Sequence, residues 1–115
     1  MSKFLVTRNK GFRMTFENGF AISVQWGPEN YCERRDHTDF DQPRKEKFWE
    51  SKSAEIAIFD TNNRIQENSS AGMISLGRDT VEGWVSADQV AKVIAIVQSS
   101  KTTEEIQQKY KALNI

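Results

Sequence analysis

Residues 28–53 gather most of the side chains that could support metal or nucleophilic chemistry. Within ten positions stand the only cysteine, the only histidine and three aspartates, at Cys32, Asp36, His37, Asp39 and Asp41. One Cys and one His match no closed zinc pattern, and the aspartates lack the glycine and distal glutamate of a calcium loop. We therefore predict no catalytic residue, no metal and no cofactor, and expect a binding protein rather than an enzyme. A small metal-dependent hydrolase built on these residues remains an alternative.

The same segment carries side chains that suit a phosphorylated ligand. Planar arginine side chains bind phosphate through two hydrogen bonds, and aromatic rings stack on nucleobases. A glycine at the end of a strand would let the backbone approach a ligand closely. We predict a ligand-binding site formed by Trp26, Gly27, Tyr31, Arg34, Arg35 and Trp49. Seven acidic residues alternate with six basic ones over 28–53, so a network of salt bridges within the loop is the competing interpretation.

The charge balance and the cysteine count exclude several classes of protein. Sixteen basic and sixteen acidic residues give a net charge of zero. Proteins that coat nucleic acids or anionic membranes carry a large positive excess, so we expect neither extended nucleic-acid binding nor a membrane partner. A single cysteine forms no internal disulfide, and no apolar stretch is long enough for a signal peptide or a membrane span. We expect a cytoplasmic protein.

Two alternating runs around Asn18-Gly19 predict a β-hairpin. A loop of three residues, 17–19, pairs Phe16 with Phe20, and it places every apolar residue of both runs on one face. A two-residue loop would send the two apolar sets to opposite faces, so the hydrophobic pattern favours the longer loop. The other face is small and polar, and we expect it to meet solvent or a ligand.

The remaining elements complete an α+β domain. Residues 54–60 predict a central strand, while 73–76 and 80–86 predict weaker extended segments. Capping boxes at Ser86 and Thr102 begin two helices, at 87–99 and from 103 onward, and each helix has one apolar stripe. Trp84 is expected to pack against the start of the first helix. We predict one domain over 1–115, an antiparallel β-sheet with two C-terminal helices on one face and a long charged loop at about 28–53.

Three stretches resemble the short accessory proteins of tailed bacteriophages. They are Met14–Cys32 with TFENG, ISVQWG and NYC, Ala54–Asp60 with AEIAI, and Gly83–Ile96 with GWVSADQVAKVI. The resemblance implies a protein that acts on the host by binding. It assigns no functional residue.

The resemblance implies a phage-encoded, non-enzymatic binding protein that acts in the host-cell cytoplasm and antagonises host defence. With the candidate site around Arg34 and Arg35, it leads us to predict sequestration of a small phosphorylated or nucleotide signal. An inhibitor that binds a host protein is the second hypothesis. Homo-oligomerisation fits either hypothesis, because an exposed edge strand can pair with a second copy of itself.

Overall fold

The computed structural model describes residues 2–8, 10–27, 30–32, 50–63, 72–77 and 79–115. Their elements are β1 (Lys3–Val6), β2 (Gly11–Thr15), β3 (Phe20–Gln25), β4 (Ser53–Asp60), β5 (Val81–Ser86), α1 (Ala87–Ser99) and α2 (Thr103–Ala112), with a short 3-10 turn at Thr61–Asn63. No helix among these residues is long and apolar enough to cross a membrane.

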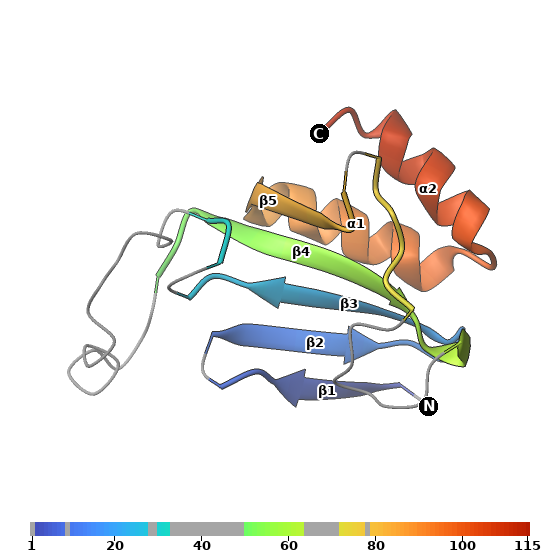
Figure 1. The fold of residues 1–115 in the computed structure, drawn as a ribbon, viewed down its shortest axis with the longest axis horizontal. Coiled ribbons are helices and arrows are strands. Elements are labelled where there is room, and N and C mark those ends of the chain that lie inside the picture. The colour runs from blue at the N-terminus through green and yellow to red at the C-terminus, as the bar shows by residue number, and fades with distance from the viewer. Residues whose placement is uncertain (1, 9, 28–29, 33–49, 64–71, 78) are drawn as a thin grey trace.

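The five strands form one antiparallel sheet in the order β1-β2-β3-β4-β5. Helix α1 packs across β3, β4 and β5, and α2 packs against α1. Figure 1 shows both helices on the β4–β5 side of the molecule, while in the described part of the chain no helix lies over β1 and β2. The predicted α+β class, a sheet with two C-terminal helices on one face, is confirmed.

The β2–β3 hairpin has the predicted three-residue loop. The Phe16 amide donates to the Phe20 carbonyl at 2.9 Å, and Met14 stands opposite Ile22. Gly19 has a φ of 88°, a left-handed conformation that costs a glycine no steric strain. The apolar residues of both strands therefore share the face that meets the helices.

Asn18, at the tip of this hairpin, also binds the end of α1. Its amide nitrogen lies 2.8 Å from the carbonyl oxygens of Val97 and Ser100, and 3.1 Å from that of Gln98. The last carbonyls of a helix have no partner within the helix, so a donor placed there stabilises its end. Asn18 thereby fixes where the C-terminus of α1 lies on the sheet.

The main core fills the space between the sheet and the helices. It combines the apolar faces of β3 and β4 with the stripe of α1 and two residues of α2, among them Ile22, Ile58, Val93, Val97, Ile106 and Tyr110. Most of these side chains are fully buried, and burial of each stabilises the fold by about 1.5–3 kcal/mol. The predicted pairing of the hairpin with the Val90–Val97 stripe is confirmed.

The opposite face of the hairpin is covered, which corrects the expectation that it meets solvent or a ligand. Arg13, Ala21 and Ser23 are all buried there. The Arg13 guanidinium lies 4.2 Å from the ring centre of Phe59, a cation–π contact that lets a charged group stay buried. Ala21, Ala57 and Phe59 form a second small core on this side. The polar residues on this face of the hairpin therefore belong to a second packed layer.

The N-terminal strand β1 has no counterpart in the predicted elements. Lys3–Val6 pairs with β2, with Phe4 opposite Met14 and Val6 opposite Phe12. The predicted extended segment at 73–76 forms only an isolated bridge between Met73 and Phe59. Of the predicted charged loop, residues 28–29 and 33–49 lie outside the described part of the chain.

Candidate functional site

A cavity of about 830 Å³ opens between the sheet and the first turns of α1. Ligand pockets in proteins typically measure about 300–1,000 Å³ and are lined mostly by apolar side chains. The wall follows this pattern, with large apolar side chains from three strands and the helix: Phe12, Val24, Trp26, Val85, Val90 and Ile94. This cavity is the candidate site.

Phe12 and Trp26 form the aromatic wall. Phe12 stands opposite Val24 in the sheet, and Trp26 follows β3, with its amide donating to the Lys10 carbonyl at 2.8 Å. The two rings meet edge to face, with centroids 6.2 Å apart and planes at 70°. Both side chains are only half-buried, so their rings keep apolar surface toward the cavity. A flat apolar group would complete this packing.

Small side chains on α1 keep the cavity open. Ala87 and Ala91 line it, one helical turn apart, beside Val90, which belongs both to the wall and to the core. A methyl side chain cannot span the distance to Phe12 and Trp26. The hollow is therefore set by the sequence of the helix.

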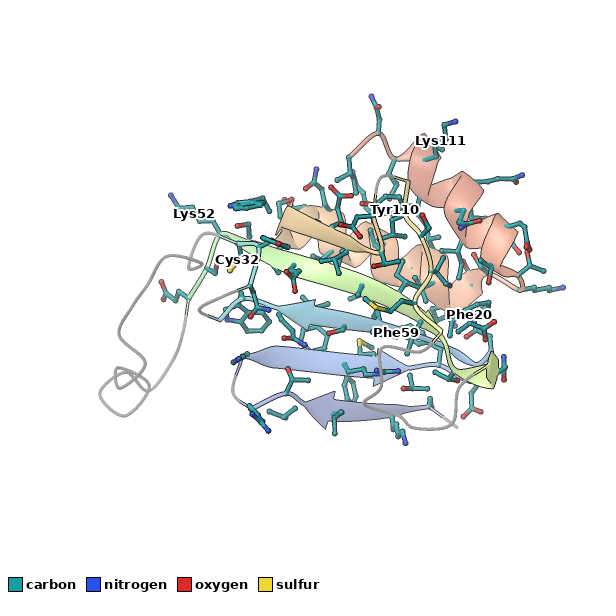
Figure 2. The ribbon with its side chains drawn as sticks, viewed as in Figure 1. Phe20, Cys32, Lys52, Phe59, Tyr110 and Lys111 are labelled. Carbon is teal, nitrogen blue, oxygen red and sulfur yellow. The ribbon has the colours of Figure 1, made fainter. Side chains whose placement is uncertain are left out.

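The mouth of the cavity is polar. Glu50, Ser51, Lys52 and Ser53 line it just before and at the start of β4. The Ser51 hydroxyl donates to the Ser53 carbonyl at 2.6 Å, and Glu50 and Lys52 add one acidic and one basic side chain. Polar groups placed in this way can orient the polar end of a ligand at the mouth. Figure 2 shows Lys52 projecting from this end of the sheet.

The chain after Trp26 folds into a tight turn. The side chain of Asn30 receives the Gly27 amide at 3.1 Å and donates to Glu55 at 3.2 Å. The Gly27 carbonyl accepts the Asn30 amide at 3.2 Å, and the Cys32 thiol lies 3.7 Å from the same oxygen. Gly27 is buried and its backbone groups are used within the turn. Ligand binding at this glycine stays a prediction, and both of its backbone groups already have partners.

Beyond the turn, Tyr31 pairs with Trp84 of β5. The Trp84 amide donates to the Tyr31 carbonyl at 2.8 Å, and the two rings lie 5.8 Å apart at 31°. Both residues are exposed, Trp84 by 58% and Tyr31 by 42%. The expectation that Trp84 packs against the start of α1 is therefore wrong.

The backbone of the exposed residue Trp84 is strained. Trp84 has a φ of 51°, which side-chain-bearing L-residues rarely adopt. It lies in a register irregularity of the β4–β5 ladder, between the pairs Ala54–Val85 and Ile56–Glu82. Gly83 lies so close to Tyr31 that an added Cβ would stand 2.5 Å from the tyrosine Cβ. A strained residue that holds a large ring in water indicates a surface kept for contact.

The predicted ligand-binding residues therefore separate. Trp26 lines the cavity on the helix side, whereas the Tyr31 amide donates to Glu55 at 3.0 Å, on the side that Glu55 shares with Gln25. The two aromatic residues therefore lie on opposite faces of the sheet. The other three predicted residues, Arg34, Arg35 and Trp49, lie outside the described residues.

The metal and nucleophile candidates lie mostly outside the described residues as well. Asp36, His37, Asp39 and Asp41 all fall in 33–49. Among the residues that the structure describes, no three His, Cys, Asp or Glu side chains come together as a metal site. Cys32 is described and is 1% exposed, at the end of the sheet shown in Figure 2. A thiol buried in this way is shielded from reagents in solvent.

The chain matches no protein-family model, no curated protein and no solved structure.

Sequence reasoning missed the cavity because its wall is made of residues that read as core. Phe12, Val24 and Val90 carry the periodic pattern of buried positions, and nothing distinguishes a residue beside a hollow from one in contact on all sides. One signal was present. Ala87 and Ala91 stand on neighbouring turns beside the apolar stripe, and small residues so placed indicate that the helix leaves space next to the sheet.

Proposed function

We propose that this chain is a non-catalytic binding protein that encloses a small molecule in the cavity beside α1. The ligand class has a flat, largely apolar ring system and one anionic or polar end. The observation that carries the proposal is the cavity itself, with the exposed edges of Phe12 and Trp26 on one wall and the helix on the other.

The orientation of the ligand follows from where the polar residues stand. The interior offers apolar surface, which favours a ring system through removal of that surface from water. Lys52 and the hydroxyl groups of Ser51 and Ser53 stand at the mouth, where an anionic end would keep contact with water and with a cation. A nucleotide with its base inside the cavity and its phosphate at the mouth is one member of this class. In this arrangement the predicted nucleotide site would include Trp26 and the other residues of the cavity wall.

A ligand screen with two arms tests this proposal. The first arm is an anilinonaphthalene sulfonate dye, whose fused rings and single sulfonate match the cavity without any nucleotide chemistry. The second arm is a panel of linear and cyclic nucleotides. A bound ligand raises the melting temperature, since it stabilises only the folded state. We expect the dye to raise it, and a nucleotide to do so if the phosphate version holds.

Variants separate the two arms. Arg34→Ala and Arg35→Ala should abolish the shift by nucleotides, leave the shift by the dye, and leave the melting temperature without ligand nearly unchanged. A dye shift without any nucleotide shift would remove the nucleotide version and keep the cavity. The absence of a shift in both arms would contradict the proposal.

The resemblance to phage accessory proteins supports a role for this binding. We propose that the ligand is a host metabolite or defence signal, and that its capture antagonises host defence in the host cytoplasm. Expression of the chain in cells that carry a nucleotide-signalling defence should restore phage growth. A cavity-filling variant should fail to restore it, and equal rescue by both would contradict this role.

A second candidate function is inhibition of a host protein, and the Tyr31–Trp84 pair favours it. Trp and Tyr are enriched among the residues that dominate binding energy at protein interfaces. We expect the wild-type chain to retain one host protein from a cell extract, in a nearly equimolar amount. Trp84→Ala should not retain this protein, and its affinity for the dye should be unchanged. Retention of the same protein by the variant would exclude the Tyr31–Trp84 pair as its binding surface.

A further inference from the structure

Strand β1 is an edge of the sheet. In the described part of the chain it pairs with β2 alone, so the backbone groups on its outer side have no strand partner. Long or apolar edges are templates for pairing with another chain, and natural proteins protect them with charges, prolines or a covering element. In β1 only Lys3 is charged, and the three residues after it are Phe4, Leu5 and Val6.

The register shows which residues carry the outward groups. The Thr7 amide donates to the Gly11 carbonyl at 3.1 Å, so Thr7 faces β2. Residues of an antiparallel pair alternate between bonding to the partner strand and facing away from it. Leu5 therefore bonds toward β2, while the amide and carbonyl groups of Phe4 and Val6 point away from the sheet.

The side chains of the same strand are exposed to an unusual degree. Phe4 is 77% exposed, Val6 70% and Leu5 41%. Phe4 and Val6 lie on the helix side next to Met14 and Phe12, so they extend the apolar face of the sheet beyond the cover of α1. Pairing at this edge would remove apolar surface from water and satisfy backbone groups at the same time.

We infer that β1 pairs with β1 of a second copy, antiparallel and centred on Leu5. In this register Phe4 stands opposite Val6 of the other copy, twice, and each pair exchanges two backbone hydrogen bonds. The two sheets become continuous, with both helical layers on the same side, because the symmetry axis is perpendicular to the sheet. This inference does not depend on the proposed function.

Three observations select this occupant and this register. The outward groups of Phe4 and Val6 are two residues apart, so the edge is complementary to its own reversed copy. Lys3 falls opposite Thr7 of the other copy, which places no like charges against each other. A register shifted toward the N-terminus would need the Ser2 amide, which already donates to the Glu17 carboxylate at 3.0 Å.

The expected association is weak. A four-residue strand buries less than the roughly 1,200 Å² of a stable standard interface, so the equilibrium should respond to protein concentration. Sedimentation equilibrium from micromolar to millimolar protein should show the mass rise from 13.2 kDa toward twice that value.

A cysteine cross-link tests the register. Leu5 of the two copies would form a non-hydrogen-bonded pair with Cα atoms about 4.5 Å apart, within disulfide reach. Leu5→Cys should therefore form a covalent dimer on mild oxidation. Lys3→Cys is the matched control, because its two copies would stand about 14 Å apart, four strand residues at 3.4 Å each. Cys32 is buried and does not compete.

Val6→Pro tests the backbone bonds. It removes an outward amide that β2 does not use, so the monomer should keep its fold by circular dichroism while the dimer is lost. Val6→Lys keeps that amide but adds a charge, and it should also give a monomer. This variant keeps the test decisive if the proline unfolds β1. The inference is overturned if the wild type stays monomeric at every concentration, if Lys3→Cys cross-links as well as Leu5→Cys, or if folded Val6→Pro and Val6→Lys both remain dimeric.

Discussion

The ring of Phe12 meets the indole of Trp26 edge to face, with the two centroids 6.2 Å apart. Phe12 comes from the second strand and Trp26 from the end of the third, so the hairpin itself builds this wall. The rest of the cavity is added by α1, whose alanines leave the rings half-covered. The contact between the two rings and the volume of the cavity in front of them therefore depend on different residues. Each can be changed by mutation without the other.

Trp26→Ala should weaken ligand binding more than it weakens the fold. The indole is half-buried, so we expect a loss of about 1–2 kcal/mol, less than the roughly 3–5 kcal/mol of a fully buried Trp. The dissociation constant of the sulfonate dye should rise about tenfold or more, equivalent to about 1.4 kcal/mol. Trp26→Phe, which keeps an aromatic ring, should recover part of the affinity. Calorimetric titration measures both variants, and unchanged affinity in Trp26→Ala would remove the indole from the site.

Asn18→Asp should destabilise the fold by about 2 kcal/mol. The carboxylate keeps the shape of the amide but donates no hydrogen bond to the carbonyls of Val97 and Ser100, and it adds a negative charge at the negative end of the α1 dipole. Urea unfolding measures the loss. Asn114→Asp adds the same charge just past the C-terminus of α2, at an exposed residue, without removing a side-chain hydrogen bond to a helix end, so it should cost less, below about 1 kcal/mol. Equal losses in the two variants would contradict the role given to Asn18.

Trp84→Gly should be more stable than Trp84→Ala by about 1 kcal/mol. Both variants lose the contact with Tyr31, but only glycine adopts a φ of 51° without steric cost. At an ordinary strand position the order is reversed, since glycine costs about 0.5–1 kcal/mol relative to alanine. Thermal unfolding of the two variants decides the sign. A more stable alanine variant would mean that residue 84 is not strained.

Tyr110 should make stability fall at alkaline pH. Burial, followed by the nearby negative charge of Glu82, raises the pKa of its phenol above the ordinary value of 10.0. The unfolded chain then releases this proton near pH 10 while the folded chain retains it, so the stability due to Tyr110 is complete below pH 10 and decreases above it. Near pH 11 the loss should be about 1 kcal/mol. Urea unfolding should show this loss in the wild type and not in Tyr110→Phe, and parallel pH profiles would contradict it.

Patterns that repeat along the chain predicted most of the fold. The alternation around Phe16 and Phe20 fixed the hairpin register, because a shift by one residue would bury polar side chains. Ser86 and Gln89 placed the start of α1, since both capping hydrogen bonds form as the sequence implies. These features depend on neighbours within a few residues, and a single sequence contains that information.

Features that depend on distant neighbours escaped prediction. Strand β1 is too short to show an alternation of apolar and polar residues. Arg13 has the residue type of a surface position, and only its contact with Phe59 explains its burial. Trp84 is a large aromatic residue of the kind expected in a core, yet it lies at a local irregularity of the sheet and is exposed to solvent. The cavity arises from a mismatch between α1 and the sheet, which only their packing reveals.

The most direct test of the central claim fills the cavity from the helix. Ala91 lines the cavity and is exposed, so Ala91→Phe should occupy the space in front of Trp26 without disturbing the core. Ala95→Phe, one turn further along α1 and outside the wall, is the matched control. We predict that calorimetric titration with the sulfonate dye detects binding to the wild type and to Ala95→Phe, and none to Ala91→Phe. Equal affinity of the dye for all three proteins would contradict binding in this cavity.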